Sequence, residues 1–76
     1  MIRYDEHAEF QLGRRGIIKA WVEEAIRTSD ATETKGSRVS YLKRLPGRHF
    51  MLRVVAPARD PDYVVTAYFD RTKPCG

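Results

Sequence analysis

The spacing of the apolar residues changes near residue 30, and this change constrains the fold more than any other feature of the chain. Before it, apolar side chains fall at positions i, i+3, i+4, i+7 and i+8, namely Ile18, Trp21, Val22, Ala25 and Ile26. They share one face of an α-helix, so the spacing predicts a helix from Ile18 to about Thr28. After residue 30, apolar and polar residues alternate, which is typical of strands with one buried face.

An earlier helix is predicted from its terminal residues. Asp5 is a suitable N-cap for a helix that begins at Glu6, whose carboxylate is favoured at the positive end of the helix dipole. The helix is expected to end at about Arg15, because Gly16 can adopt the left-handed conformation that follows many helices. Ile17 then supplies the apolar contact that often accompanies such a turn.

The alternating segments predict an antiparallel sheet. The expected strands cover residues 2–4, 31–35, 38–45, 49–56 and 63–69. Gly36-Ser37 and Pro46-Gly47 are turn dipeptides between successive strands, and residues 57–62 form a polar loop. The chain is therefore expected to be one α+β domain over residues 1–76, with two N-terminal helices packed on one face of an antiparallel sheet of about four strands. Residues 69–76 are expected to be a loose tail.

Alternation also assigns side chains to the two faces of the sheet. In the strand at 49–56, we expect Phe50, Leu52 and Val54 to pack on the helices, which turns His49 and Arg53 to the open face. If Val65, Ala67 and Phe69 face the core in the last strand, other side chains join Arg53. The open face is then expected to include Tyr41, Lys43, Thr66 and Tyr68.

Positive charge is concentrated in the strand region. Residues 35–59 contain seven cations and no Asp or Glu: Lys35, Arg38, Lys43, Arg44, Arg48, Arg53 and Arg59. We term these residues the basic block. The formal net charge of +4 is thus focused on one segment, which favours polyanionic partners, above all nucleic acid, or an acidic protein. The alternative is that these side chains only solvate the open face of the sheet.

Several classes of protein are disfavoured by the composition. The single cysteine, Cys75, allows no intramolecular disulfide and no thiolate cluster for zinc. No apolar stretch is long enough to span a membrane, and no charged-then-apolar signal segment opens the chain. We therefore expect a cytoplasmic protein without a metal or a cofactor.

Short motifs in a defined order resemble a known family. They are His7-Ala8, Arg15-Gly16-Ile17, Trp21-Val22-Glu23-Glu24-Ala25-Ile26, Leu52-Arg53-Val54-Val55 and Val64-Val65-Thr66-Ala67-Tyr68. Together they resemble the small bacterial domain-of-unknown-function family numbered 4258, over about Tyr4 to Phe69. That family is similar in its helix-helix-sheet layout to RelE-type toxins and other small metal-independent ribonucleases. The resemblance implies a candidate ribonuclease, often the toxin of a toxin–antitoxin pair.

The resemblance also marks candidate site residues, which are His7, Arg15, Arg53, Thr66 and Tyr68. Gln11 departs from the pattern, since relatives often carry a basic residue at that position, and this departure bears on the strength of any active site.

Cleavage of RNA without a metal needs a base for the 2′-OH proton, an acid for the leaving 5′-oxygen and cations for the phosphate. Histidine titrates near neutrality and suits both proton-transfer tasks. We therefore expect His7 to be the general base, with Tyr68 or His49 as the proton donor. Arg53 and Lys43 are expected to clamp the phosphate, the arginine through its planar fork.

The expected RNA-binding residues lie in the basic block and beside it: Arg15, Arg38, Lys43, Arg44, Arg48, His49 and Thr66. A surface with aromatic side chains among cations is typical of proteins that bind single strands.

Each candidate also has a purely structural interpretation. His7 could form a hydrogen bond that fixes the helix to the sheet, and His49 could be a solvated residue. Arg53 could form an ion pair with Asp70 or a helix carboxylate, and Arg15 could interact with the helix dipole or an acidic side chain. Thr66 and Tyr68 could be plain strand residues. The sequence thus favours an RNA-binding, metal-independent endoribonuclease that an acidic antitoxin neutralises. The alternative is a non-catalytic basic domain that binds an acidic protein or nucleic acid.

Overall fold

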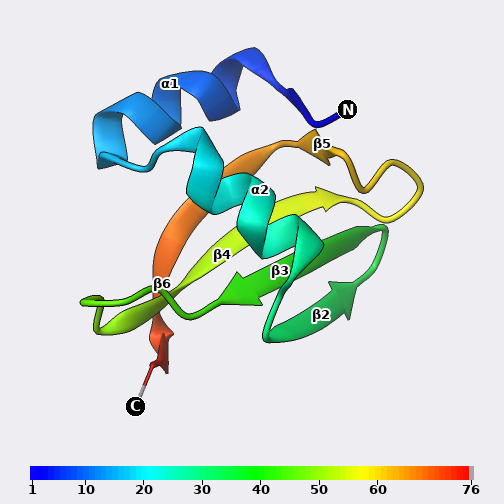
Figure 1. Cartoon of the computed structure of the whole chain (residues 1–76). Coiled ribbons are helices and arrows are strands. Elements are labelled where there is room, and N and C mark those ends of the chain that lie inside the picture. Colours follow the sequence, from blue (N-terminus) through cyan, green and yellow to red (C-terminus); the bar gives the residue numbers. More distant parts are fainter. Residues whose placement is uncertain (76) are drawn as a thin grey trace.

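The computed structural model describes residues 1–75 and contains two helices and a four-stranded antiparallel sheet (Figure 1). The elements of this fold are α1 (Glu6–Arg15), α2 (Lys19–Arg27), β2 (Ala31–Lys35), β3 (Arg38–Lys43), β4 (Phe50–Pro57) and β6 (Thr66–Pro74). Two short strands, β1 (Arg3–Tyr4) and β5 (Tyr63–Val64), pair in parallel with each other. The predicted α+β fold, with the helices before the strands of the sheet, is confirmed.

Both ends of α1 are set by local sequence. Asp5 takes the N-cap position, but instead of capping the helix its carboxylate accepts a hydrogen bond from the Tyr63 hydroxyl, 3.0 Å away. Gly16 adopts a left-handed φ of 67° and donates its N–H back into the helix, as predicted. The Ile17 N–H reaches the Leu12 carbonyl at 2.9 Å, and the buried Ile17 side chain leads into α2.

The helices cover one face of the sheet, whose strand order is β2-β3-β4-β6. α1 lies along β6, and α2 crosses β3 and β4 (Figure 1). The core between them is made of small and branched apolar side chains: Ala8, Leu12, Ile17, Val22, Ala25, Leu45, Leu52, Val54, Val64 and Ala67. Their burial removes apolar surface from water and holds the two layers together.

The last strand is longer than predicted and continues to Pro74. Residues 69–74 are therefore not the loose tail that we expect from the sequence. β6 pairs with β4 through Met51–Asp70 and Phe50–Pro74, which leaves residues 71–73 without a partner in β4. The Cys75 N–H then donates to the His49 carbonyl at 2.9 Å. These main-chain hydrogen bonds order the segment despite its polar side chains.

The prediction that Val65 faces the core is wrong. Val65 lies between β5 and β6 and is partly exposed, whereas Val64 is fully buried. The strand is interrupted there because β5 pairs with β1, while the Val65 N–H donates to β4 at 2.9 Å. The interruption shifts the alternation, so Val64 and Ala67 both face the helices. Thr66 and Tyr68 keep the open face predicted for them, opposite residues of β4.

β3 turns its side chains the opposite way from the prediction. Its register pairs Leu42 with Arg53, so Tyr41 and Lys43 lie on the helix side of the sheet. There the Lys43 ammonium donates to the Thr28 carbonyl at 2.8 Å. Leu42 lies on the open face and is only 2% exposed. Lys43 is therefore not a neighbour of Arg53 on that face.

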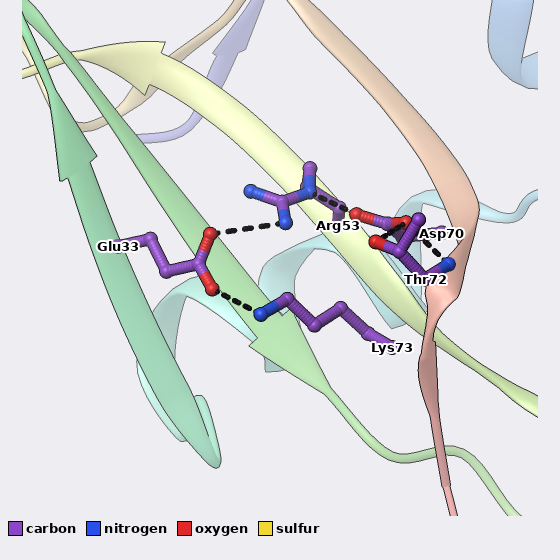
Figure 2. A network of polar contacts seen from close by, with 5 residues as sticks. All are labelled: Glu33, Arg53, Asp70, Thr72 and Lys73. Carbon is purple, nitrogen blue, oxygen red and sulfur yellow. Dashed lines mark hydrogen bonds and ion pairs between the residues drawn. The ribbon is translucent and has the colours of Figure 1, made fainter.

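Polar contacts draw together the two edge strands of the sheet (Figure 2). Glu33 on β2 lies 3.1 Å from Nη2 of Arg53, in the middle of the sheet, and 2.7 Å from Nζ of Lys73 on β6. Arg53 Nε also donates to Asp70 Oδ2 at 2.7 Å. Since β2 and β6 are opposite edges, these contacts require the sheet to curl on the side away from the helices.

Asp70 is the most buried carboxylate of this network. Its Oδ1 accepts hydrogen bonds from the Thr72 hydroxyl and N–H at 2.6 and 2.8 Å, and its Oδ2 accepts from Arg53. The contacts from Thr72, and then the guanidinium of Arg53, lower the pKa of Asp70 from 3.8 to about 2. Hydrogen bonds from Lys73 and then Arg53 also lower the pKa of Glu33. Both carboxylates are thus ionised at neutral pH and hold Arg53 between them.

We expect Asp70→Asn to destabilise the fold at neutral pH and to lose this effect in acid. Because the folded-state pKa lies below the ordinary 3.8, ionised Asp70 stabilises the fold fully above that value, and its contribution disappears as the pH falls through about 2. The lowered pKa corresponds to about 2 kcal/mol of unfolding free energy at neutral pH. Urea unfolding of both proteins between about pH 2 and pH 7 measures the difference.

Glu24→Gln is the control for this experiment, because Glu24 is an exposed carboxylate on α2. This change should alter the unfolding free energy little across the same range of pH. A destabilisation by Asp70→Asn that stays constant down to about pH 2 would contradict the role given to the Asp70 charge.

Candidate nucleic-acid interface

A hollow of about 390 Å³ lies at the centre of the open face of the sheet. Its walls bring together three predicted site residues, Arg38, Arg53 and Tyr68, from β3, β4 and β6. Arg53 and Tyr68 are cross-strand partners, so their side chains stand side by side. Glu33 and Asp70 line the same hollow and counter part of its positive charge.

Arg53 is an ion-paired residue, which is the structural interpretation that the sequence left open for it. Its side chain is only 12% exposed, with Nε bound to Asp70 and Nη2 bound to Glu33. A bidentate grip on a phosphate through these two nitrogens would have to displace a carboxylate. The Arg53 charge is therefore used mainly to hold the curled sheet.

A larger pocket of about 460 Å³ opens at the free edge of β6, between the end of α1 and the turn that precedes β4. We term it the edge pocket, and its functional side chains are Arg15, Arg48, His49, Tyr68, Phe69 and Arg71. Four of these are predicted site residues that the fold brings together. Within residues 1–75, no carboxylate side chain lines this pocket, so its charge is entirely positive.

The arginines of the edge pocket are held by contacts with the sheet and its aromatic rings. Arg15 donates from Nη1 to a main-chain carbonyl of β6 at 2.8 Å, and its guanidinium lies 5.8 Å from the Tyr68 ring centre. The guanidinium of Arg48 lies 4.8 Å from the Phe69 ring centre and 5.2 Å from that of Trp21. These cation–π contacts orient the guanidinium groups without neutralising their charge.

A further pocket of about 500 Å³ surrounds the start of α1, and we term it the His7 pocket. His7 is exposed there, beside Arg38 and Thr66. Its Nε2 lies 3.5 Å from the side-chain nitrogen of Gln11, one helical turn away. That contact stays within α1, so the structural interpretation of His7 as a link between helix and sheet is not supported.

The three pockets form one continuous surface along β6. Tyr68 lines both the central hollow and the edge pocket, and Arg38 lines both the central hollow and the His7 pocket. His7 and Arg53, however, line different pockets. The predicted catalytic residues therefore line adjoining pockets and are not gathered in one pocket.

Two predicted RNA-binding residues lie away from this surface, at the end of β3. Lys43 is on the helix side, where it binds Thr28. Arg44 donates from Nε to the Cys75 carbonyl at 3.2 Å, and its main-chain N–H donates to the Asp30 carboxylate at 2.8 Å. Both side chains therefore link the end of β3 to other segments, Lys43 to Thr28 after α2 and Arg44 to Cys75 after β6.

Most cations of the basic block form no ion pair within residues 1–75 and can therefore attract an anion. Of its seven cations, only Arg53 has a carboxylate within 4.0 Å in the part of the chain that is described. The remaining ion pairs there involve Arg3, Lys19, Arg27 and Lys73, which lie outside the block. The positive field expected from the sequence is therefore not cancelled by neighbouring side chains.

Arg71, Phe69 and Glu33 are among the residues of this surface that the sequence does not predict as site residues. Arg71 falls in the segment that was expected to be a tail, and Phe69 was expected only in the core. Glu33 lies on an exposed edge strand, where nothing in the local sequence indicates that it reaches the middle of the sheet. Arg71 could be recognised as a site residue only if β6 were known to keep pairing with β4 near the end of the chain. That pairing depends on a register shift.

Among residues 1–75, no group of three or more His, Cys, Asp or Glu side chains is placed to hold a metal ion. No helix in that part is both long and apolar enough to cross a membrane.

Comparison with known proteins places the chain in a family. No curated protein and no solved structure matches it. A family model does match, that of the domain of unknown function DUF4258, over residues 4–69. The matched region begins in β1, contains both helices and reaches into β6, so it includes His7, Arg38 and Tyr68. The chain therefore belongs to the DUF4258 family.

Proposed function

We propose that this protein binds single-stranded RNA along β6 and cleaves it without a metal, in the manner of a RelE-type toxin. The observation that carries the proposal is a set of arginines without a carboxylate within 4.0 Å in residues 1–75: Arg15, Arg48 and Arg71 in the edge pocket, and Arg38 between the central hollow and the His7 pocket. Phosphate groups of a single strand would be neutralised by these cations, which supplies most of the affinity in such complexes.

Aromatic side chains between the cations favour single strands over duplexes. Tyr68 stands between two pockets, and Phe69 lines the edge pocket below Arg48. Unpaired bases stack on such rings, whereas the bases of a duplex are stacked on each other and are not available. The surface therefore suits RNA that is locally unpaired.

Cleavage is assigned to the His7 pocket. In this reaction His7 takes the proton of a 2′-OH, the resulting oxygen attacks the adjacent phosphorus, and the bond to the 5′-oxygen breaks as that oxygen receives a proton. Arg38 would bind the phosphate as its charge grows. Tyr68, in the hollow that adjoins at Arg38, is the candidate proton donor. Thr66 offers a hydroxyl to the same phosphate.

An acidic antitoxin is the proposed partner. A net charge of +4 with a concentrated basic block gives such a protein a surface that it can cover by charge complementarity. Covering the block would exclude RNA and would also stabilise the fold by mass action.

The separation of His7 from Arg53 favours the second candidate function, a non-catalytic domain that binds nucleic acid or an acidic protein. In this alternative the same cations bind the partner, while His7 takes part in no proton transfer. Measurements of binding and of cleavage therefore distinguish the two proposals.

We expect RNA binding to weaken steeply with salt, with a log–log slope of about −0.7 for each phosphate contact. Arg38→Gln should make the slope shallower by about 0.7, because Arg38 borders two of the pockets. Arg27→Gln is the matched control, since Arg27 pairs with Glu23 on the exposed side of α2. Fluorescence anisotropy with a labelled single strand measures both. Equal changes in the two variants, or binding indifferent to salt, would argue against this surface.

We expect His7→Ala to slow EDTA-resistant RNA cleavage by about 10²–10⁴-fold and to leave RNA binding nearly unchanged, because a general base acts only on the chemical step. His7 is exposed, so the variant should fold, and circular dichroism checks this. Glu6→Ala, at an exposed site in the same helical turn, is the control. Native-rate cleavage by a folded His7→Ala protein would remove His7 from the mechanism. Absence of cleavage by the native protein, with or without ribosomes, would favour the non-catalytic domain.

A further inference from the structure

The edge pocket contains more positive charge than an internal phosphate of RNA would need. Arg15, Arg48 and Arg71 all line it, and none has a carboxylate within 4.0 Å in residues 1–75. The central hollow differs, because there Arg53 is already neutralised by Glu33 and Asp70. The edge pocket is thus the strongest site on this surface for an anion of more than one charge.

The arginines are also oriented before any ligand arrives. Arg15 is tied to the main chain of β6, and Arg48 lies against the rings of Phe69 and Trp21. A guanidinium carries five N–H donors, and stacking on a ring uses none of them. Donors therefore remain free to bind a ligand in the pocket, and less side-chain freedom is lost when it binds.

Charge and shape together define the class of ligand. An internal phosphodiester carries one negative charge, whereas a phosphate monoester carries about 1.5 to 2 at neutral pH and offers three acceptor oxygens. The partly buried ring of Tyr68 lines the pocket and is the candidate surface on which a base can stack, whereas Phe69 already packs against Arg48 and the core. Its volume of about 460 Å³ is within the usual range for small-molecule sites.

We infer that the edge pocket binds a nucleotide through a phosphate monoester, either at the end of an RNA strand or as a free mononucleotide. Arg48, Arg71 and Arg15 bind the phosphate, and Tyr68 stacks on the base. Binding of a nucleotide at the end of an RNA strand rests on the proposed function, whereas binding of a free mononucleotide does not.

The test compares ligands that differ only in the phosphate. One short single-stranded RNA is prepared with a 5′-phosphate, with a 3′-phosphate and with hydroxyls at both ends, and adenosine 5′-monophosphate is compared with adenosine. Dissociation constants are measured by calorimetry at fixed salt. One of the terminal phosphates, or the phosphate of the mononucleotide, should tighten binding by about 10- to 100-fold, the range for hydrogen bonds to charged groups.

Variants locate the effect in the edge pocket. Arg71→Gln should remove most of the gain given by the phosphate, and Arg71 is exposed, so the fold should tolerate the change. Arg48→Gln should act in the same direction. Arg14→Gln is the matched control: it removes the same charge from an exposed residue next to Arg15 that does not line the pocket. A similar loss in the Arg14 variant would show that only overall charge matters and would overturn the inference.

The ligands also separate this inference from the proposed function. Salt-dependent binding of the RNA with two hydroxyl ends, without any gain from a phosphate monoester on RNA or on adenosine, overturns the inference and leaves RNA binding in place. A gain for adenosine 5′-monophosphate with no binding of any RNA supports the pocket and refutes the proposed function. A gain with one phosphorylated end supports both and identifies the end.

Discussion

Arg53 carries its charge in the middle of the sheet, and the two carboxylates that neutralise it come from strands on either side. Asp70 belongs to the adjacent β6, whereas Glu33 belongs to β2, beyond β3. Glu33 reaches Arg53 and Lys73 only because the sheet curls. Removing either carboxylate would leave the nearly buried charge of Arg53 only partly compensated, which is costly, so the ion pairs help to hold the curled sheet.

The ion pairs within the curled sheet determine which cations remain available to bind an anion. At the centre of the open face, carboxylates occupy Arg53 and leave it little freedom to bind a ligand. At the edge of β6, cations from α1, from the turn before β4 and from β6 itself meet around aromatic rings without a carboxylate among the described lining residues. The ion-paired Arg53 and the edge-pocket cations, which have no carboxylate within 4.0 Å in residues 1–75, are therefore separated, and Tyr68 lines both the hollow and the edge pocket.

Local patterns predict the parts of this structure that depend on neighbouring residues. The apolar stripe of α2 is confirmed except at Ile18, which is the N-cap of the helix and is 52% exposed, and the left-handed Gly16 is confirmed. In β4, Leu52 and Val54 face the core as predicted, but Phe50 is only partly buried, and Met51 and Val55 are buried as well. The face of β3 is not predicted, because Val39, Tyr41 and Leu42 supply apolar side chains to both faces, and only pairing with β4 fixes the choice. The Glu33 contact and the edge pocket depend on curl and on a register shift in β6, which join residues far apart in sequence.

If RNA lies along β6, as we propose, amide NMR of the 15N-labelled protein identifies the residues that it contacts. On titration with a short single-stranded RNA, we predict that the shifted amides gather in residues 66–71, in residues 47–50 and at the end of α1 near Arg15. Amides on the exposed side of α2, around Glu24, should stay unchanged. Shifts that gather on α2, or spectra that RNA leaves unaltered, would contradict binding along β6.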